Sequence, residues 1–205
     1  MREDLVAYIS NEIIPLYERF DAAHRREHVD MVIAQSLQLA EQKGADPEMA
    51  YVIAAYHDTG LSHGRETHHL VSGKIIRKDA CLRRWFTTSQ IEIMAEAAED
   101  HRASAEHVPR SLYGKIVAEA DRYIEPEVII RRTIQYGLDH YPELDKEQHY
   151  QRMLAHLHEK YYYGGYLKLW FEDSPNAIRL ERLRKMIDDE SCLRGIFDEI
   201  FRRVQ

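Results

Sequence analysis

Residues 54–61 read AAYHDTGL, so a histidine and an aspartate stand side by side directly after a run of small and apolar residues. A carboxylate that ends such a run is costly to bury unless a cation pairs with it. His57 and Asp58 lie near the expected end of a helix, where the negative end of the helix dipole adds to the demand for positive charge. We therefore expect other histidines, cationic side chains or a bound ion to lie beside the Asp58 carboxylate.

Apolar residues recur at helical spacing on both sides of this stretch, without sustained strand alternation. A first helix is expected from about residue 4 to residue 20. A second carries an apolar stripe from Val29 to Ala40 and stops at Gly44. A third begins with Asp46-Pro47 as N-cap and first residue. The expected starts of three more helices are Thr67, Ser89 with Glu92 in a capping-box pattern, and Ser111.

After Pro126 the punctuation predicts about four more helices, separated by Tyr141-Pro142, Gly164-Gly165 and Ser174-Pro175. The predicted fold class is all-α. Residues 1–125 are expected to form a helical core, and residues 126–205 a helical extension of the same domain packed on it. The tyrosine-rich segment at 161–166 could stack a nucleobase, but packing onto a core is the more frequent role of such a cluster.

Composition narrows the class of protein. The 205 residues carry a formal net charge of −7, which argues against an extended nucleic-acid surface but allows a local basic pocket for a phosphorylated ligand. Two distant cysteines indicate free thiols in a reducing compartment. We see no signal peptide and no apolar run long enough to span a membrane, so a cytoplasmic protein is expected. The oligomeric state stays open, a homodimer included.

The sequence contains twelve histidines, and their positions indicate which of them could bind a metal ion. One histidine on an apolar face is usually a hydrogen-bonded core residue. Asp121 is harder to explain, because it lies within the stripe of its helix and no lysine or arginine shares that stripe. Imidazole and carboxylate groups together suit ions such as Zn, Fe and Mn. The residues at the inner faces or ends of the predicted helices are His28, His57, Asp58, His69, His101 and Asp121.

The order His28, then His57-Asp58, then Asp121, resembles the H…HD…D signature of the HD-domain superfamily of metal-dependent phosphohydrolases. The resemblance covers about the first 125 residues and implies an HD-type helical bundle. His69-Leu-Val-Ser-Gly73 is similar to an H-x-x-x-G motif of one branch, and His101 falls where that branch has its next ligand. His68 competes with His69 for this role, and the spacing to Gly73 favours His69. The GYP motif of that branch is missing.

This resemblance implies two divalent ions, of Fe, Mn, Mg or Zn, with Asp58 as the bridging and catalytic carboxylate. His28, His57, Asp58 and Asp121 would hold the first ion, and Asp58, His69 and His101 the second. A water between the ions would attack a phosphate ester. The substrate would be a small phosphorylated molecule or a nucleotide.

A phosphate also needs cationic partners. Arg102 follows a predicted ligand, and Arg110 and Lys115 flank the start of the helix that carries Asp121. Each of the three could instead be a solvated surface charge. His24 could donate a proton to the leaving group, or be an ordinary surface histidine.

Two other functions stay open at this point. The same ligand set resembles that of HD-type di-iron oxygenases, which activate dioxygen on a small polar substrate. An HD domain can also serve as a metal-stabilised sensor or interaction module without turnover. Phosphohydrolases are the more frequent use of the fold and are therefore the favoured reading.

Overall fold

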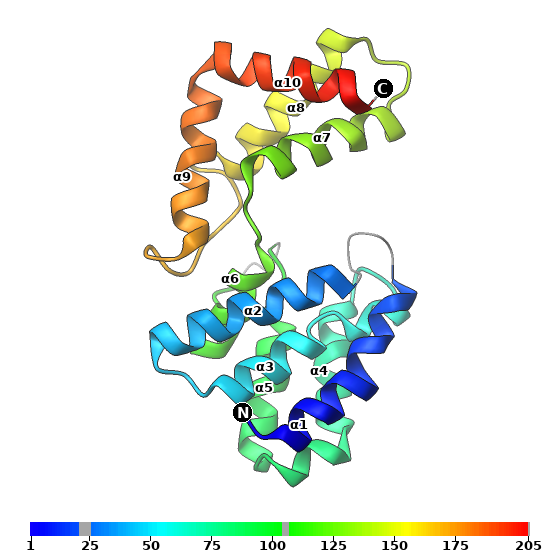
Figure 1. Ribbon diagram of the computed structural model, residues 1–205, viewed down its shortest axis with the longest axis vertical. Helices are drawn as coiled ribbons and strands as arrows, with labels where there is room; N and C mark the ends of the chain where they lie inside the picture. Colours follow the sequence, from blue (N-terminus) through cyan, green and yellow to red (C-terminus); the bar gives the residue numbers. More distant parts are fainter. Residues whose placement is uncertain (21–25, 104–106, 205) are drawn as a thin grey trace. The chain divides into compact units, whose positions relative to one another are not determined.

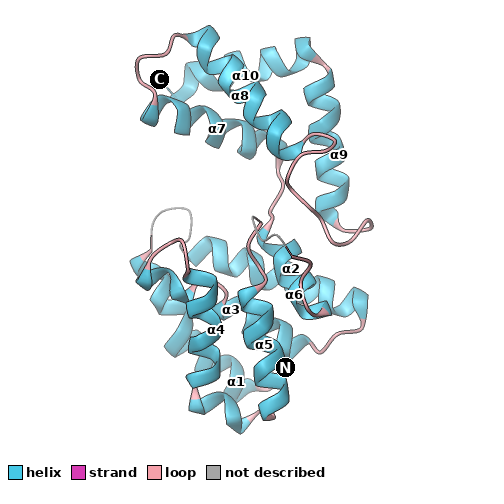
Figure 2. Cartoon of the chain, turned by 180° about the vertical axis from the view of Figure 1, so that it is seen from behind, coloured by secondary structure: helices cyan, strands magenta, loops and turns pink. Residues whose placement is uncertain are grey.

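The structure, a computed structural model, describes residues 1–20, 26–103 and 107–204. Within these ranges the chain forms helices and loops and no strand (Figure 2), which confirms the all-α prediction. None of the helices described is both long and apolar enough to cross a membrane. The chain divides into two compact units, Met1–Tyr123 and Ile124–Gln205. The expectation that the second unit packs on the first stays a prediction.

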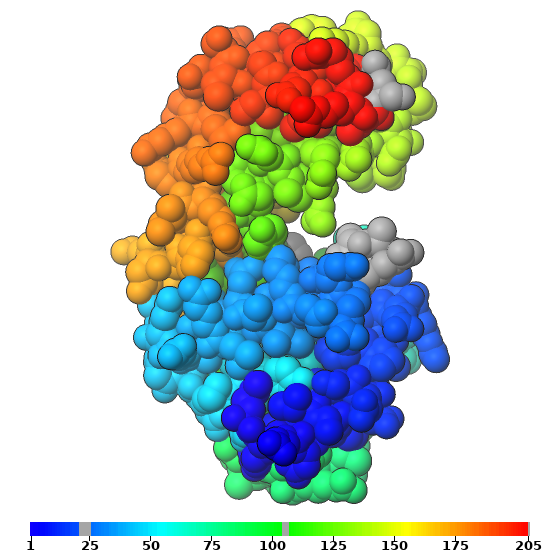
Figure 3. All heavy atoms as spheres, viewed as in Figure 1, coloured from blue at the N-terminus to red at the C-terminus, as the bar shows by residue number. Residues whose placement is uncertain are grey.

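The first unit is built around α3 (Figure 1), which packs against α2, α5 and α6. Every residue of α3 from Met49 to Tyr56 is buried, because the helix is apolar all round. On the face drawn in Figure 3, the N-terminal residues and α2 form much of this unit's surface. The α-helices of the unit are α1 (Glu3–Tyr8), α2 (Arg26–Lys43), α3 (Pro47–Tyr56), α4 (His68–Lys78), α5 (Thr88–Glu99) and α6 (Leu112–Asp121).

The predicted first helix is in fact three consecutive segments. After α1 the chain forms a π turn, η1 (Ile9–Ile13), and then a 3-10 segment, η2 (Ile14–Arg19). Pro15 lies at the start of η2, and its missing N–H breaks the regular hydrogen-bond ladder. Two further 3-10 segments are η3 (Thr59–His63), directly after Asp58, and η4 (Ala80–Arg84).

Several predicted caps are present. The Asp46 carboxylate accepts from the N–H of Glu48, and the Ser111 hydroxyl accepts from the N–H of Gly114. Thr67 is the residue before α4 but makes no side-chain cap bond. The capping box of α5 was predicted at the wrong residues. It is formed by Thr87 and Gln90 rather than by Ser89 and Glu92. Both pairs fit the spacing, and the helix begins two residues earlier than expected.

Two glycines let the segments around His57-Asp58 approach closely. A side chain at Gly60 would come within 2.1 Å of the His68 carbonyl oxygen, and the Gly60 N–H donates to the Ser72 hydroxyl at 2.9 Å. A side chain at Gly73 would overlap Glu99 on α5. The absence of a side chain at Gly60 therefore lets η3 pack closely against α4, and its absence at Gly73 lets α4 pack closely against α5.

The second unit contains the four helices predicted after Pro126. They are α7 (Pro126–His140), α8 (Lys146–Tyr161), α9 (Pro175–Asp188) and α10 (Glu190–Val204), and α7 packs against the other three. In the tyrosine-rich segment, Tyr161 is buried as favoured, whereas Tyr163 and Tyr166 are exposed.

Candidate metal centre

The ends of five helices bring histidines and aspartates together in the first unit. His28 lies in the first turn of α2, and His57 and Asp58 directly follow α3. His68 begins α4, His101 follows α5 by two residues, and Asp121 is the last residue of α6. Buried side chains are normally apolar, so a cluster of ionisable groups at this depth calls for a shared ligand.

The first set of donors consists of His28, His57, Asp58 and Asp121. The Nε2 atoms of His28 and His57 are 3.2 Å apart, and Asp58 Oδ2 lies 3.6 Å and 3.2 Å from them. Asp121 Oδ1 is 3.1 Å from His28 Nε2 and 3.7 Å from His57 Nε2. Two donors on one ion at about 2.1 Å would be roughly 3.0–3.4 Å apart, so this spacing suits a single ion.

The second set contains Asp58, His68 and His101. Asp58 Oδ1 lies 3.2 Å from His68 Nε2 and 3.5 Å from His101 Nε2, and the two imidazole nitrogens are 3.1 Å apart. Asp58 thus turns one oxygen to each set. Its carboxylate has the arrangement of a bridge between two ion positions.

The tautomers of three histidines follow from their backbone contacts. The Nδ1 atoms of His57, His68 and His101 lie 2.7, 2.7 and 2.6 Å from the carbonyl oxygens of Ala54, Arg65 and Ala98. A carbonyl only accepts, so each Nδ1 carries the hydrogen and a neutral ring presents the Nε2 lone pair to the cluster. Lone pairs that converge at about 3 Å repel each other unless a cation lies among them. The residues present therefore fit a metal ion, which is also how metal-binding histidines are usually oriented.

The charge interactions within the cluster also favour a bound cation. Burial opposes protonation of His28, but the carboxylates of Asp121 and Asp58 outweigh it and raise the pKa of His28 to about 9. Burial opposes ionisation of Asp121, yet its contact with His28 lowers the pKa of Asp121 to about 2. Burial opposes ionisation of Asp58, but its interactions with the surrounding imidazoles of His57, His101 and His28 prevail and hold the pKa of Asp58 well below its usual value. Both carboxylates are therefore ionised and available as ligands.

The structure brings His68 into the cluster and leaves His69 out of it, contrary to the sequence-based preference. His68, Ser72 and Ile76 are spaced four residues apart and form the buried side of α4 that faces η3. Gly73, one turn after His69, lies on the adjacent side of α4, where a side chain would meet Ala95 and Glu99 of α5. The spacing to Gly73 was a correct sign of close helix packing, but it marked the wrong face. Burial also disfavours protonation of His69 and lowers its pKa to about 4.

The three predicted phosphate partners have different surroundings. Arg102 is half-buried beside His101, and its Nη1 donates to the carbonyl oxygen of Glu66 at 2.7 Å. Lys115 is half-buried in the first turn of α6. Arg110 forms ion pairs with the carboxylates of Glu99 and Asp100. His24, the predicted proton donor, lies outside the described residues.

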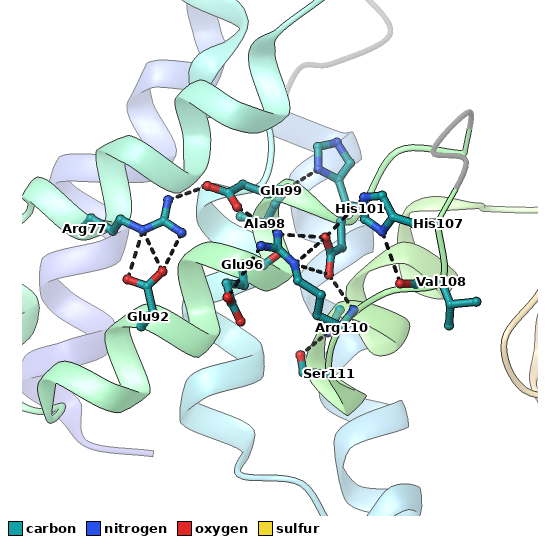
Figure 4. Close-up of polar contacts among 12 residues, drawn as sticks. Arg77, Glu92, Glu96, Ala98, Glu99, His101, His107, Val108, Arg110 and Ser111 are labelled. Atoms are coloured by element: carbon teal, nitrogen blue, oxygen red, sulfur yellow. Dashed lines mark hydrogen bonds and ion pairs between the residues drawn. The ribbon is translucent and has the colours of Figure 1, made fainter.

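Arg110 neutralises Asp100, whose side chain is fully buried. Its Nη2 lies 2.8 Å from Asp100 Oδ1 and 2.8 Å from Glu99 Oε2, and its backbone N–H donates to Asp100 Oδ2 at 2.7 Å. Figure 4 shows Arg110 and Arg77 approaching Glu99 from two sides. The sequence-based role of Arg110 in phosphate binding is thus not supported, because a buried carboxylate next to His101 already engages its donors.

Arg122 is a buried cation that the sequence reasoning overlooked. It directly follows Asp121 and donates to the carbonyl oxygens of Ala118 and Arg102, the latter at 3.3 Å. Burial lowers the pKa of Arg122, against the charges of Asp121 and Glu119. Its position directly after Asp121 was the feature of the sequence that could have indicated a residue near the cluster.

Comparison with known proteins agrees with this geometry. The family model of the HD domain matches residues 25–125, which identifies this part of the chain as a member of the HD-domain superfamily. A crystal structure at 1.45 Å resolution of a predicted HD superfamily hydrolase from an uncultured Thermotogales bacterium has a similar fold, with a TM-score of 0.55. It shares 20% sequence identity, over 97% of this chain and 91% of that one. No curated protein matches the chain.

Proposed function

We propose that the chain is a metal-dependent phosphohydrolase that acts on a small phosphorylated molecule. The observation that carries the proposal is the position of Asp58, whose two oxygens face two separate pairs of histidines. The HD domain and the hydrolase of similar fold support the same class of reaction. The proposal also follows the H…HD…D resemblance of the sequence.

Six residues would hold two divalent ions. His28, His57, Asp58 and Asp121 offer four donors to the first ion, and Asp58, His68 and His101 offer three to the second. A smaller protein set leaves more coordination positions for water and substrate, as a catalytic ion requires. When bound, the ions would supply Lewis-acid stabilisation of the phosphoryl group and lower the pKa of the attacking water.

The protein's own groups orient and neutralise this site. The backbone carbonyls of Ala54, Arg65 and Ala98 fix three imidazole rings, so little reorganisation is needed when the ligand set is used. Within the part of the chain that the structure describes, the guanidinium of Arg102 donates one hydrogen bond, to the carbonyl oxygen of Glu66. Its other N–H groups can contact phosphate oxygens, which makes Arg102 a better candidate than Arg110.

The proposal is tested on purified protein stripped with a chelator and reloaded separately with Mn²⁺, Fe²⁺, Zn²⁺ or Mg²⁺. Metal content and hydrolysis of p-nitrophenyl phosphate and bis-p-nitrophenyl phosphate are measured on each form. We expect about two ions per chain and hydrolysis in at least one form. A matched control is Asp58→Asn beside Asp30→Asn, an exposed aspartate on α2.

Hydrolysis lost with Asp58→Asn and kept with Asp30→Asn would support the proposal. A loaded protein that hydrolyses no phosphate ester would overturn it. Oxygen uptake by the Fe²⁺ form, measured with an oxygen electrode on small polyols, separates an oxygenase from a hydrolase in the same preparation.

A further inference from the structure

Asp100 is a buried carboxylate beside the metal centre that belongs to neither set of proposed donors. It is the C-cap residue of α5 and directly precedes His101, and the exposed fraction of its side chain is 0%. A carboxylate at this depth loses its hydration, so a partner has to compensate for the loss. The identity and position of that partner indicate what Asp100 does.

Arg110 contacts both oxygens of the Asp100 carboxylate. Its Nε and Nη2 atoms donate to Oδ1 at 3.0 Å and 2.8 Å, and its backbone N–H donates to Oδ2 at 2.7 Å. Charge-assisted contacts from several donors fix the direction of a carboxylate as well as its distance. The largely exposed His107 is a more distant partner, with its Nε2 atom 3.9 Å from Asp100 Oδ1.

This ion pair joins the end of α5 to the start of α6. Arg110 directly precedes the N-cap residue of α6, and its Nη2 atom also donates to the carbonyl oxygen of Glu96 on α5 at 3.0 Å (Figure 4). Gly114 lies in the first turn of α6, and a side chain there would come within 3.3 Å of Asp100 Oδ2. The first turn of α6 therefore packs closely against the Asp100 carboxylate.

The position of His101 depends on this junction, because His101 lies beyond the last residue of α5. The contact of its Nδ1 atom with the Ala98 carbonyl oxygen orients the ring, and its Nε2 atom lies 3.5 Å from Asp58 Oδ1. Metal–ligand distances tolerate deviations of only about 0.2 Å. A small shift of the backbone at Asp100 would therefore move His101 out of the range needed to share an ion with Asp58.

The stability of the fold is a weak reason for such a pair. The cost of removing two charges from water offsets much of their attraction, so a buried ion pair is often no better than apolar packing of the same volume. What the pair adds is a defined geometry between its two helices. That geometry matters here because α5 leads into His101.

We propose that Asp100 and Arg110 are positioning residues that hold His101 in the second set of donors and thereby set the affinity for the second ion. The inference rests on the two-ion site of the proposed function and extends it to a pair outside the donor sets. The first ion should be affected little, because three of its four proposed donors lie on α2 or directly after α3. The fourth, Asp121, lies at the far end of α6, which also packs against α2 and α3.

The test measures metal binding without substrate. Mn²⁺ is titrated into chelator-treated protein by calorimetry, and elemental analysis counts the bound ions. The step that disappears in His68→Ala identifies the second ion. Asp100→Asn turns one carboxylate oxygen into an amide group that faces the donors of Arg110. It should weaken the second ion by about tenfold, within the range typical of residues that support metal ligands, and the first by less than about threefold.

Variants of Arg110 test the pair from its other side. Arg110→Gln should reproduce the effect of Asp100→Asn. Arg110→Lys should lie between Arg110→Gln and wild type, because lysine keeps the charge but not the planar set of donors. The double variant Asp100→Asn/Arg110→Gln should bind the second ion about as well as either single variant, since the two residues act as a unit.

Two controls remove other ion pairs of the first unit. The side chain of Arg2 is 42% exposed, against 41% for Arg110, and it binds Glu48 on α3. Arg2→Gln should bind both ions as wild type does. Glu99→Gln removes the other carboxylate that Arg110 binds and should also leave the second ion unchanged, which separates the contact with Asp100 from the contact with Glu99.

Thermal melts without metal distinguish positioning from general stability. A merely structural role would lower Tm and weaken both ions together, and this result would overturn the proposal. Unchanged affinity for the second ion in Asp100→Asn, or wild-type protein that binds a single ion, would overturn it as well. If the second ion depends on Asp100 and no phosphate ester is hydrolysed, the positioning role stands and the phosphohydrolase proposal fails.

Discussion

Asp58 Oδ1 lies 3.2 Å from the Nε2 atom of His68, the first residue of α4. The adjacent His69 belongs to neither set of donors described here. Two neighbouring residues of one helix thus have opposite relationships to the same carboxylate. The pair offers an internal comparison, because both side chains are imidazoles within the same turn.

We predict that His68→Ala lowers the metal content from about two ions to about one and removes most phosphatase activity. It deletes one of three donors of the second set, and the remaining two cannot complete the site. His69→Ala should keep both ions, with a change in rate of less than about threefold. Metal analysis and kcat on the two variants check this. The reverse ranking would restore the sequence-based choice of His69.

A second prediction concerns the contact between η3 and α4. Gly60→Ala should destabilise the first unit by about 1–3 kcal/mol, because its methyl group would lie 2.1 Å from the His68 carbonyl oxygen and backbone has to move. The same shift should weaken metal binding through His68. Urea unfolding and metal titration measure the two effects.

Gly195→Ala is the control for that experiment. Gly195 is exposed within α10, and a side chain there meets no atom within 4 Å. The substitution should be neutral or stabilise by about 0.5–1 kcal/mol through helix propensity. A Gly60→Ala protein as stable as wild type would mean that η3 does not rest on α4 as described.

The candidate ligands named from the sequence lie together in the structure where only one residue could occupy the inner face or end of its helix. His28, His57, His101 and Asp121 each sat on or beside an apolar stripe, and the structure gathers all four. Two adjacent histidines at a helix start are a harder case, because they differ by about 100° of rotation and only the neighbouring element decides between them. That element, η3, is a 3-10 segment without an apolar period of its own.

Arg110 shows a second limit of sequence reasoning. It lies directly before Ser111 and α6, as the sequence indicated, but its carboxylate partners Glu99 and Asp100 were not expected. In the sequence, Asp100 was notable only for its position before His101. Nothing there showed that its side chain would be buried. Burial of a carboxylate depends on the packing of α5 and α6 together, and it determines where the nearest arginine binds.

The Glu99 network gives a pH prediction. Burial opposes ionisation of Glu99, but hydrogen bonds from Arg77 and Arg110 prevail and lower its pKa below the ordinary 4.5. A carboxylate with a lowered folded-state pKa stabilises the fold fully above its unfolded pKa, and this stabilisation is lost as pH falls through the folded value. Glu99→Gln should therefore cost about 1–2 kcal/mol at pH 7.

The difference between wild type and Glu99→Gln should shrink progressively below pH 4.5. Urea unfolding of both proteins between pH 7 and pH 3 measures it, with Glu66→Gln, an exposed residue before α4, as the control. A difference that stays constant across this range would show that Glu99 acts through packing rather than through its charge.

The last prediction is that metal ions stabilise the folded first unit through Asp58. A ligand that binds only the folded state at 100 times its Kd adds about 2.7 kcal/mol, which corresponds to roughly a 10 °C rise in Tm for a unit of this size. Addition of Mn²⁺ to chelator-treated protein should produce such a rise, and excess chelator should reverse it. Asp58→Asn should abolish the rise, because both sets of donors lose the negative charge of the carboxylate that they share. Asp30→Asn should retain it. Differential scanning calorimetry with and without Mn²⁺ decides the matter, and a rise in Tm that persists undiminished in Asp58→Asn would mean that the stabilising ion binds elsewhere in the chain.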